Sequence, residues 1–235
     1  GALDALTTGD YNIAIGYNTG TLLATGGSNT LIGALAGNAL TGGDGNVAIG
    51  KSAMSAADGT ESNNVAIGFG TLAAMNNNAS NYNTAVGYNA GTAVSTGLQN
   101  TIIGGLAGDA LNTGGQNVAL GYEALSTEDA GYLNTAIGHR ALKVQDAGNA
   151  YNTALGSSAG VSVSTGIHNT LIGGLAGDAL TTGSNNTIIG YNAAASAVDV
   201  SNEVTIGNSS VANVRIPADS TLKIGASGDL QLEHL

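Results

Sequence analysis

The sequence repeats the pattern Asn-x-x-aliphatic-Gly twelve times between residues 12 and 207. Asparagine begins eleven copies, and Glu203 begins the twelfth. Glycine ends every copy, and successive glycines lie 17 to 19 residues apart, at Gly16, Gly33, Gly50, Gly68, Gly87, Gly104, Gly121, Gly138, Gly156, Gly173, Gly190 and Gly207. A helical repeat needs about 33 residues or more. The period therefore predicts an all-β fold, a parallel β-solenoid of about twelve coils of 17–19 residues.

Each Asn-x-x-aliphatic-Gly segment is short, β-branched and bounded by turn formers, which is typical of a strand. One face of the strand carries Thr or Val and the aliphatic residue, and the other carries Asn, the middle residue and Gly. Both faces are apolar or small, so we expect burial on both sides. Twelve coils stacked about 4.8 Å apart would form a rod of roughly 50 Å. We also expect a ladder of asparagine amides, and glycines with positive φ or close contacts.

The second half of each repeat predicts which side faces inward. The third residue after the glycine is always small, which indicates close approach of backbone in a thin interior. An apolar pair and a polar turn follow, and the extra residues of longer repeats fall in the turns, as in 56–63 and 75–82. Because insertions are tolerated on surface loops, we expect these turns to lie outside.

A longer period lies above the short one. Nearly the same twelve residues occupy positions 29–40, 100–111 and 169–180. These copies are 71 and 69 residues apart, which is four short repeats, so the duplicated unit is a block of four coils. The middle strand residue is Leu31, Ile102 or Leu171 in this stretch, where most repeats have alanine. We therefore expect these coils to be the most tightly packed of each block.

Composition excludes several classes of protein. An apolar content of 43% with only 9% charged residues argues against disorder. The net charge of −11 argues against nucleic-acid binding, which requires a basic surface. The absence of cysteine excludes disulfides and thiol chemistry. Without an apolar run of eighteen residues or a signal peptide, we expect no membrane insertion. The chain begins with Gly1 rather than methionine, as a fragment or a processed form would.

A single thin stack of coils would leave much apolar strand surface in water. Three chains around one axis are the simplest closed assembly that covers such a surface without forming an open filament. We therefore expect a homotrimer.

The pattern Asn-x-x-Ile-Gly-x-x-Ala, with glycine-rich turns over residues 12–207, resembles the left-handed β-roll heads of trimeric autotransporter adhesins. The segment NEVTIGNSSVANVRIP (202–217) is similar to bacteriophage tail-fibre segments that precede a C-terminal chaperone, and IGASGDLQLEHL (224–235) to the segment that follows. These resemblances imply a left-handed coil and a trimeric virion fibre. They also imply two parts, a β-roll rod (1–200), then the last coil and a transition to a further C-terminal region (201–235). Residues 233–235 also match the start of a vector-encoded tail.

No catalytic, cofactor-binding or metal-binding residues are predicted. The three histidines, His139, His168 and His234, occupy different positions in the repeat, so we expect exposed or spacer roles rather than a triad or metal site. No zinc-protease, serine-hydrolase or phosphate-loop motif is present. The acid pairs of the variable turns, Glu128 with Asp129 and Asp58 with Glu61, could bind a cation or act as glycosidase carboxylates. Solvated turn charge is the favoured interpretation.

Aromatic residues follow the repeat glycine at Tyr17, Phe69, Tyr88, Tyr122 and Tyr191. They either form a groove for sugar stacking or pack across neighbouring coils or subunits, and packing is favoured. Asp109, Asp178 and Asn38 recur at one position, where we expect them to bond turn amides. Threonine alternates with valine in the strands, which disfavours an ice-binding array.

The sequence thus predicts a structural and adhesive module rather than an enzyme, without cofactor or metal. The expected role is the rigid shaft or head of a phage tail fibre, located in the virion, that presents host-recognition elements. Its expected partners are two further copies, other virion proteins and a host receptor or polysaccharide. The alternative is the head of a bacterial trimeric surface adhesin that binds host cells or matrix, located at the cell surface.

Overall fold

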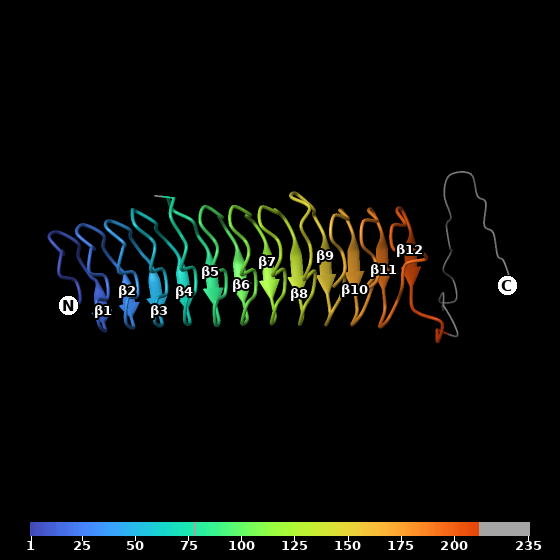
Figure 1. Cartoon of the computed structure of the whole chain (residues 1–235), viewed down its shortest axis with the longest axis horizontal. Helices are drawn as coiled ribbons and strands as arrows, with labels where there is room; N and C mark the ends of the chain where they lie inside the picture. The colour runs from blue at the N-terminus through green and yellow to red at the C-terminus, as the bar shows by residue number, and fades with distance from the viewer. Residues whose placement is uncertain (78, 212–235) are drawn as a thin grey trace, which may run out of the picture.

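A computed structural model describes residues 1–77 and 79–211 of the 235-residue chain. The described residues form a rod of stacked coils, with one short strand per coil (Figure 1). The strands join in a single parallel sheet in sequence order. They are β1 (Ile13–Ile15), β2 (Thr30–Ile32), β3 (Val47–Ile49), β4 (Val65–Ile67), β5 (Thr84–Val86), β6 (Thr101–Ile103), β7 (Val118–Leu120), β8 (Thr135–Ile137), β9 (Thr153–Leu155), β10 (Thr170–Ile172), β11 (Thr187–Ile189) and β12 (Val204–Ile206). The prediction of an all-β parallel β-solenoid is confirmed.

The register of the sheet aligns equivalent residues of successive repeats. In β6 and β7, for example, Ile102 pairs with Ala119 and Ile103 with Leu120. Extra residues in the longer repeats are absorbed in the turns, so Ala136 of β8 still pairs with Ala154 of β9. Each position of the repeat therefore becomes a column that runs along the rod, and a property of one position becomes a property of a whole face.

The two faces of the strands differ in burial. The middle residue points inward and is fully buried from Leu31 to Ile188, whereas its two strand neighbours point outward and stay partly or largely exposed. The small residue three positions after the glycine is also fully buried, from Thr19 to Ala193. Ser210, the last of that column, is exposed at the end of the described chain. We predicted burial of both strand faces. Within one chain, only the inner face is buried.

The interior is filled in a four-coil alternation. Leu31 projects over two glycines, since an added Cβ at Gly20 or Gly37 would lie 2.8 or 3.0 Å from a Leu31 methyl. Coils that have alanine at the middle position and no such neighbour instead carry a large, buried side chain four residues after the repeat glycine, at Met54, Leu72, Leu125 and Leu142. In each pair of coils the large side chain therefore comes either from the strand, as with Leu31, or from the segment after the repeat glycine, as with Met54 and Leu72. The twelve-residue stretch therefore fills its part of the interior from the strand side, and its rank as the most tightly packed layer of the block stays a prediction.

The repeat glycines meet both expected requirements. Gly104 has a φ of +132°, a region that side-chain-bearing residues avoid. A Cβ added there would lie 2.6 Å from the carbonyl oxygen of Gly121 in the next coil. Glycine is needed at this position because the backbones of adjacent coils touch there.

The asparagine ladder exists, but its main bonds go to backbone groups. Asn100 Oδ1 accepts the backbone N–H of Asn117 (3.0 Å), and Asn100 Nδ2 donates to the carbonyl of Gly114 (2.9 Å), in the turn that leads into Asn117. Amide-to-amide bonds accompany these in some steps, for example from Asn117 Nδ2 to Asn100 Oδ1 (3.2 Å). Each asparagine thus ties the start of the next strand to the turn that leads into it. Glu203 ends the ladder, because its carboxylate can only accept, and it does so from Ser196.

Replacing Asn100 with alanine should lower the free energy of unfolding by roughly 2–4 kcal/mol, since the Gly114 carbonyl and the Asn117 amide would lose buried partners. Asn134 is the matched control. Its Nδ2 is buried without a hydrogen-bond partner, and its Oδ1 accepts only the Asn152 amide. Asn134→Ala should therefore cost about half as much. Urea unfolding followed by circular dichroism measures both, and equal losses would contradict the ladder account.

Candidate functional site

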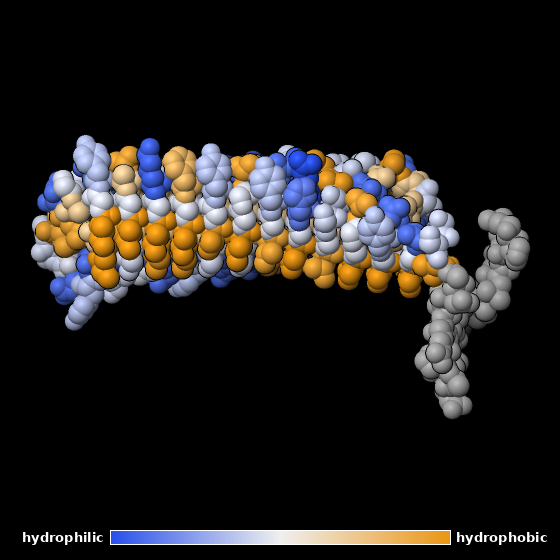
Figure 2. All heavy atoms as spheres, turned by 90° about the horizontal axis from the view of Figure 1, so that it is seen from below, coloured by the Kyte–Doolittle hydropathy of each residue, from blue (hydrophilic) through white to orange (hydrophobic). Residues whose placement is uncertain are grey.

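The outer face of the sheet carries an uncovered apolar column. It is formed by the last residue of each strand, and Figure 2 shows it as a continuous orange stripe along the rod. Leu120 and Leu155 in its middle are 41% and 45% exposed. The column consists of Ile15, Ile32, Ile49, Ile67, Val86, Ile103, Leu120, Ile137, Leu155, Ile172, Ile189 and Ile206. Such a contiguous apolar surface is a candidate interface with another protein chain.

The parallel column at the first strand position mixes threonine with Val47, Val65 and Val118. It widens the apolar face over β3, β4 and β7, whereas four successive strands, β8 to β11, begin with threonine. The expectation against an ice-binding array stays a prediction.

A second candidate surface is the column that follows the repeat glycines. Phe69 and Tyr88 stack with ring centroids 5.5 Å apart and planes 12° apart, and Lys51 Nζ lies 5.9 Å from the Phe69 ring. Tyr122 and His139 form a second stack, with centroids 5.8 Å apart and planes 13° apart. The predicted packing of rings across neighbouring coils is confirmed for these residues. Tyr17 and Tyr191 remain more than two-thirds exposed.

Charged groups gather beside the second stack. Glu123 accepts hydrogen bonds from Arg140 Nε (2.9 Å) and Lys143 Nζ (2.6 Å). The bond from Lys143 is the main cause that lowers the pKa of Glu123 to about 2, and the Tyr122 hydroxyl and Arg140 assist. The same contact with Glu123 raises the pKa of Tyr122. Sequence reasoning missed this network, although Glu123 and Arg140 occupy the same repeat position in adjacent coils.

The two histidines that the structure describes are exposed. His139 is exposed and stacks on Tyr122, and His168 is exposed with its ring centroid 5.5 Å from that of Tyr151. His234 lies outside the described residues. Among residues 1–77 and 79–211, no group of His, Asp or Glu is placed to hold a metal ion.

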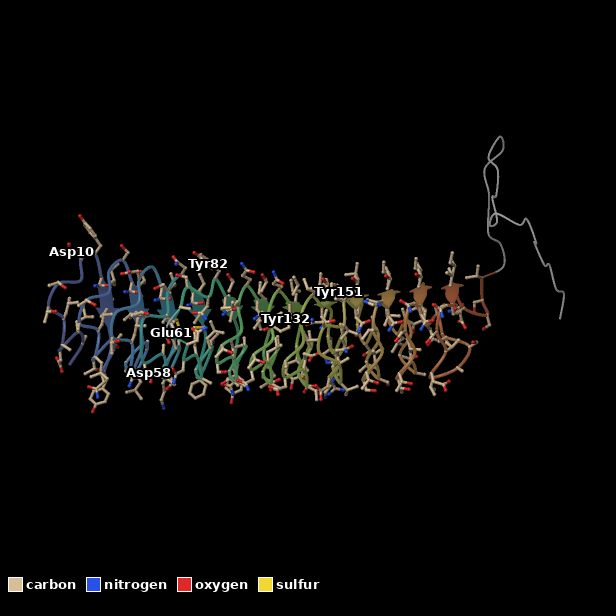
Figure 3. The ribbon with its side chains drawn as sticks, turned by 90° about the horizontal axis from the view of Figure 1, so that it is seen from above. Asp10, Asp58, Glu61, Tyr82, Tyr132 and Tyr151 are labelled. Atoms are coloured by element: carbon tan, nitrogen blue, oxygen red, sulfur yellow. The ribbon has the colours of Figure 1, made fainter. Side chains whose placement is uncertain are left out.

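The variable turns correct one prediction. Asp58 and Asp129 are exposed as expected, but Glu61 and Glu128 are fully buried. Glu61 turns inward and accepts the backbone N–H groups of Gly59 (3.0 Å) and Asn77 (2.9 Å), which link two neighbouring turns. Figure 3 shows Asp58 at one edge of the rod and Glu61 inside the coil. Turn insertions therefore supply interior groups as well as surface ones, because backbone amides need acceptors.

Glu128 occupies a core column that is otherwise mostly apolar. It lies seven residues after its repeat glycine, where other coils carry Leu23, Leu40, Ala57, Met75, Val94, Leu111, Val163 and Leu180. Neither carboxyl oxygen has a hydrogen-bond partner. Burial is the main cause that raises the pKa of Glu128 to about 7, and the negative charge of Asp146 adds to it. The amides of Gly131 and Ala147 lie near the carboxyl without meeting hydrogen-bond geometry, and they oppose the rise only in part.

The recurring polar position of the twelve-residue stretch does not bond turn amides as predicted in its first copy. The Asn38 side-chain nitrogen instead faces the carbonyls of Leu35 (2.9 Å) and Ser55 (3.0 Å). Asp109 has one buried oxygen without a partner, and burial raises the pKa of its carboxyl. Asp178 is half-buried.

Three tyrosines mark the block boundaries. Tyr11, Tyr82 and Tyr151 each precede the first asparagine of a block, and all are more than half exposed. Tyr82 and Tyr151 lie along the same edge of the rod in Figure 3. The recurrence of YNIAIG, YNTAVG and YNTALG was the signal for this row.

The part of the chain that the structure describes holds no helix of the length and apolar character that crossing a membrane requires. Comparison of the chain with protein-family models, curated proteins and solved structures found no match.

Proposed function

We propose that this chain is the rigid rod of a homotrimeric fibre, the shaft or head of a phage tail fibre that holds host-recognition elements away from the virion. The observation that carries the proposal is the uncovered apolar column on β1–β12. A soluble monomer rarely leaves so long an apolar surface in water, so a partner surface of the same length is needed. Another copy of the chain supplies such a surface with the same coil spacing.

A closed ring around an axis parallel to the rods suits a fibre best. It keeps all chains pointing the same way, so that the recognition elements gather at one tip. The columns also support stiffness, because each backbone coil is bonded to its neighbours along the whole described rod. Three parallel rods would multiply weak receptor contacts through avidity.

Replacing Leu120 with aspartate should convert the trimer into a monomer of 22.8 kDa, because three carboxylates would be buried in one layer of the interface. Leu98 is the matched control, since it has the same 41% exposure but lies outside the strands. Leu98→Asp should keep three times the monomer mass. Light scattering on both purified variants and the native chain measures this. A monomeric native chain, or dissociation by Leu98→Asp as well, would refute the trimer proposal.

The location has a separate test. Gold-labelled antibodies against the rod should decorate tail fibres of virions in electron micrographs. Labelling of bacterial surfaces alone would favour the adhesin head instead. Incubation with host polysaccharide should release no new reducing ends, because the proposed role is structural and adhesive.

A further inference from the structure

One step along the rod lacks the backbone bonds that join neighbouring turns. From the coil of β6 to the coil of β7, the carbonyl of Asp129 accepts three turn amides at 2.8–3.4 Å, those of Asn112, Thr113 and Gly114. From the coil of β7 to the coil of β8, none of the amides of residues 128–131 donates to a backbone carbonyl of the next coil. Residues 128–131 therefore need another attachment to the stack.

The equivalent step of the first block shows what such an attachment looks like. It lies between β3 and β4, since both steps join the third and fourth coils of a four-coil block. There the buried Glu61 accepts the amide of Gly59 from its own coil (3.0 Å) and the amide of Asn77 from the next coil (2.9 Å). A glutamate thus connects two turns that the backbone alone does not connect.

Glu128 occupies the step between β7 and β8 without making this connection. It lies close to one amide of its own coil and one of the next, those of Gly131 and Ala147, but neither carboxyl oxygen has a hydrogen-bond partner. The carboxyl fills the inside of the turn, because a Cβ added at Gly131 would lie 2.1 Å from Glu128 Cδ. Asn134 Nδ2, which follows in the same coil, is also buried without a partner. The turn is therefore closed by packing rather than by polar bonds.

The charges that face Glu128 are all negative. Asp129 comes from its own turn and Asp146 from the next coil, and the preceding coil contributes Leu111 and uncharged polar residues. The cations of the next coil, Arg140 and Lys143, bind Glu123 instead. An ionised Glu128 would therefore be a buried charge with two repulsive neighbours and no counter-ion, which is strongly unfavourable unless the group reaches water.

We propose that the turn of residues 128–133 is a proton-controlled latch, closed over the core while Glu128 is protonated and open when Glu128 has released its proton to solvent. In the open form the carboxylate reaches water, and the Asp129 carbonyl moves away from the three amides that it accepts. The strands β7 and β8 stay paired, because their register does not involve this turn. The latch belongs to a single chain and does not depend on the proposed fibre function.

Residue-resolved hydrogen exchange of the native chain at pH 5 and pH 8 tests the latch, after correction for the pH dependence of exchange in free amides. The reporters are the amides of Asn112, Thr113 and Gly114, which donate to the Asp129 carbonyl. Their opening equilibrium should rise roughly 50- to 100-fold, because the pKa of Glu128 is about 7 in the closed turn and 4.5 when the carboxyl is in water. Opening therefore increases from about pH 4.5 and levels off above pH 7.

The matched control is the equivalent step of the first block. The amides of Thr41 and Gly42 donate to the Gly59 carbonyl, both at 3.1 Å, in the turn that Glu61 holds with two hydrogen bonds. Their opening equilibrium should not change between the two pH values. An equal rise at both steps would overturn the latch, because it would mean that the whole rod loosens.

Variants of the carboxyl complete the test. Glu128→Gln cannot ionise, so its reporter amides should be as protected at pH 8 as at pH 5. Glu128→Leu should behave in the same way, since Leu111 fills this position one coil earlier, and it keeps the test valid if the glutamine variant folds poorly. Asp129→Asn should retain most of the pH response. Equal protection of the native chain at both pH values, or a pH response that persists in Glu128→Gln, would refute the latch.

Discussion

Replacing Gly104 with alanine should lower the free energy of unfolding by roughly 3–5 kcal/mol. The φ of +132° is strained for any residue with a side chain, and the new Cβ would lie 2.6 Å from the Gly121 carbonyl oxygen. The neighbouring atom belongs to backbone, so relief requires two coils to separate and their hydrogen bonds to weaken. Urea unfolding followed by circular dichroism measures the loss as a fall in the unfolding midpoint.

Gly105 provides the adjacent control. Alanine there would make only ordinary contacts, the nearest at 3.5 Å, and its backbone conformation is open to any residue. Gly105→Ala should be neutral or slightly stabilising, because it reduces the freedom of the unfolded chain. If Gly105→Ala lowered the free energy of unfolding as much as Gly104→Ala, the loss at Gly104 would not come from its positive φ and its backbone contact. That result would contradict the account of the glycine column.

The stability of the rod should fall by about 3 kcal/mol between pH 4.5 and pH 7 because of Glu128. The pKa of Glu128 rises from 4.5 to about 7 on folding, chiefly through burial. The folded chain therefore binds this proton more tightly than the unfolded chain does. The stabilisation is complete below pH 4.5, and it is lost as pH rises through 7. Unfolding midpoints measured across this pH range test the slope.

Glu128→Gln should remove this part of the slope, and Glu128→Leu should both remove it and raise stability at pH 8, since Leu111 fills the equivalent position one coil earlier. Asp129→Asn is the control, because Asp129 is adjacent but exposed and adds only a minor repulsion. It should retain most of the slope. A Glu128→Gln variant with the native pH profile would contradict the account.

The periodic sequence was sufficient to predict the strands, since nearly every pentapeptide has β-branched residues next to its middle position and asparagine and glycine at its ends. It was also sufficient for the inward position of the middle residue and for the glycine column, because both follow from stacking identical backbones. Glu61 and Glu128 show where this reasoning failed. Turn residues are usually exposed, but Glu61 turns inward to accept two backbone amides, whereas Glu128 occupies a core column without such a partner.

The candidate sites depended on the structure to a greater extent. The repeat position after the glycine was recognisable as an aromatic column, but the sequence could not show how each ring is oriented. The structure stacks Phe69 on Tyr88 and Tyr122 on His139. The hydrogen bonds of Glu123 with Arg140 and Lys143 could likewise not be predicted from the sequence, because they depend on the distances between side chains of different coils.

The sequence by itself determined the coil, its period, its inner and outer columns and the four-coil block, because a repeat can only stack in register with itself. The tertiary structure decided which polar groups are buried and how the block is packed. Leu31 in one coil and Met54 in the next fill the same interior from opposite sides, a relation between non-adjacent residues that only the closed coil brings together.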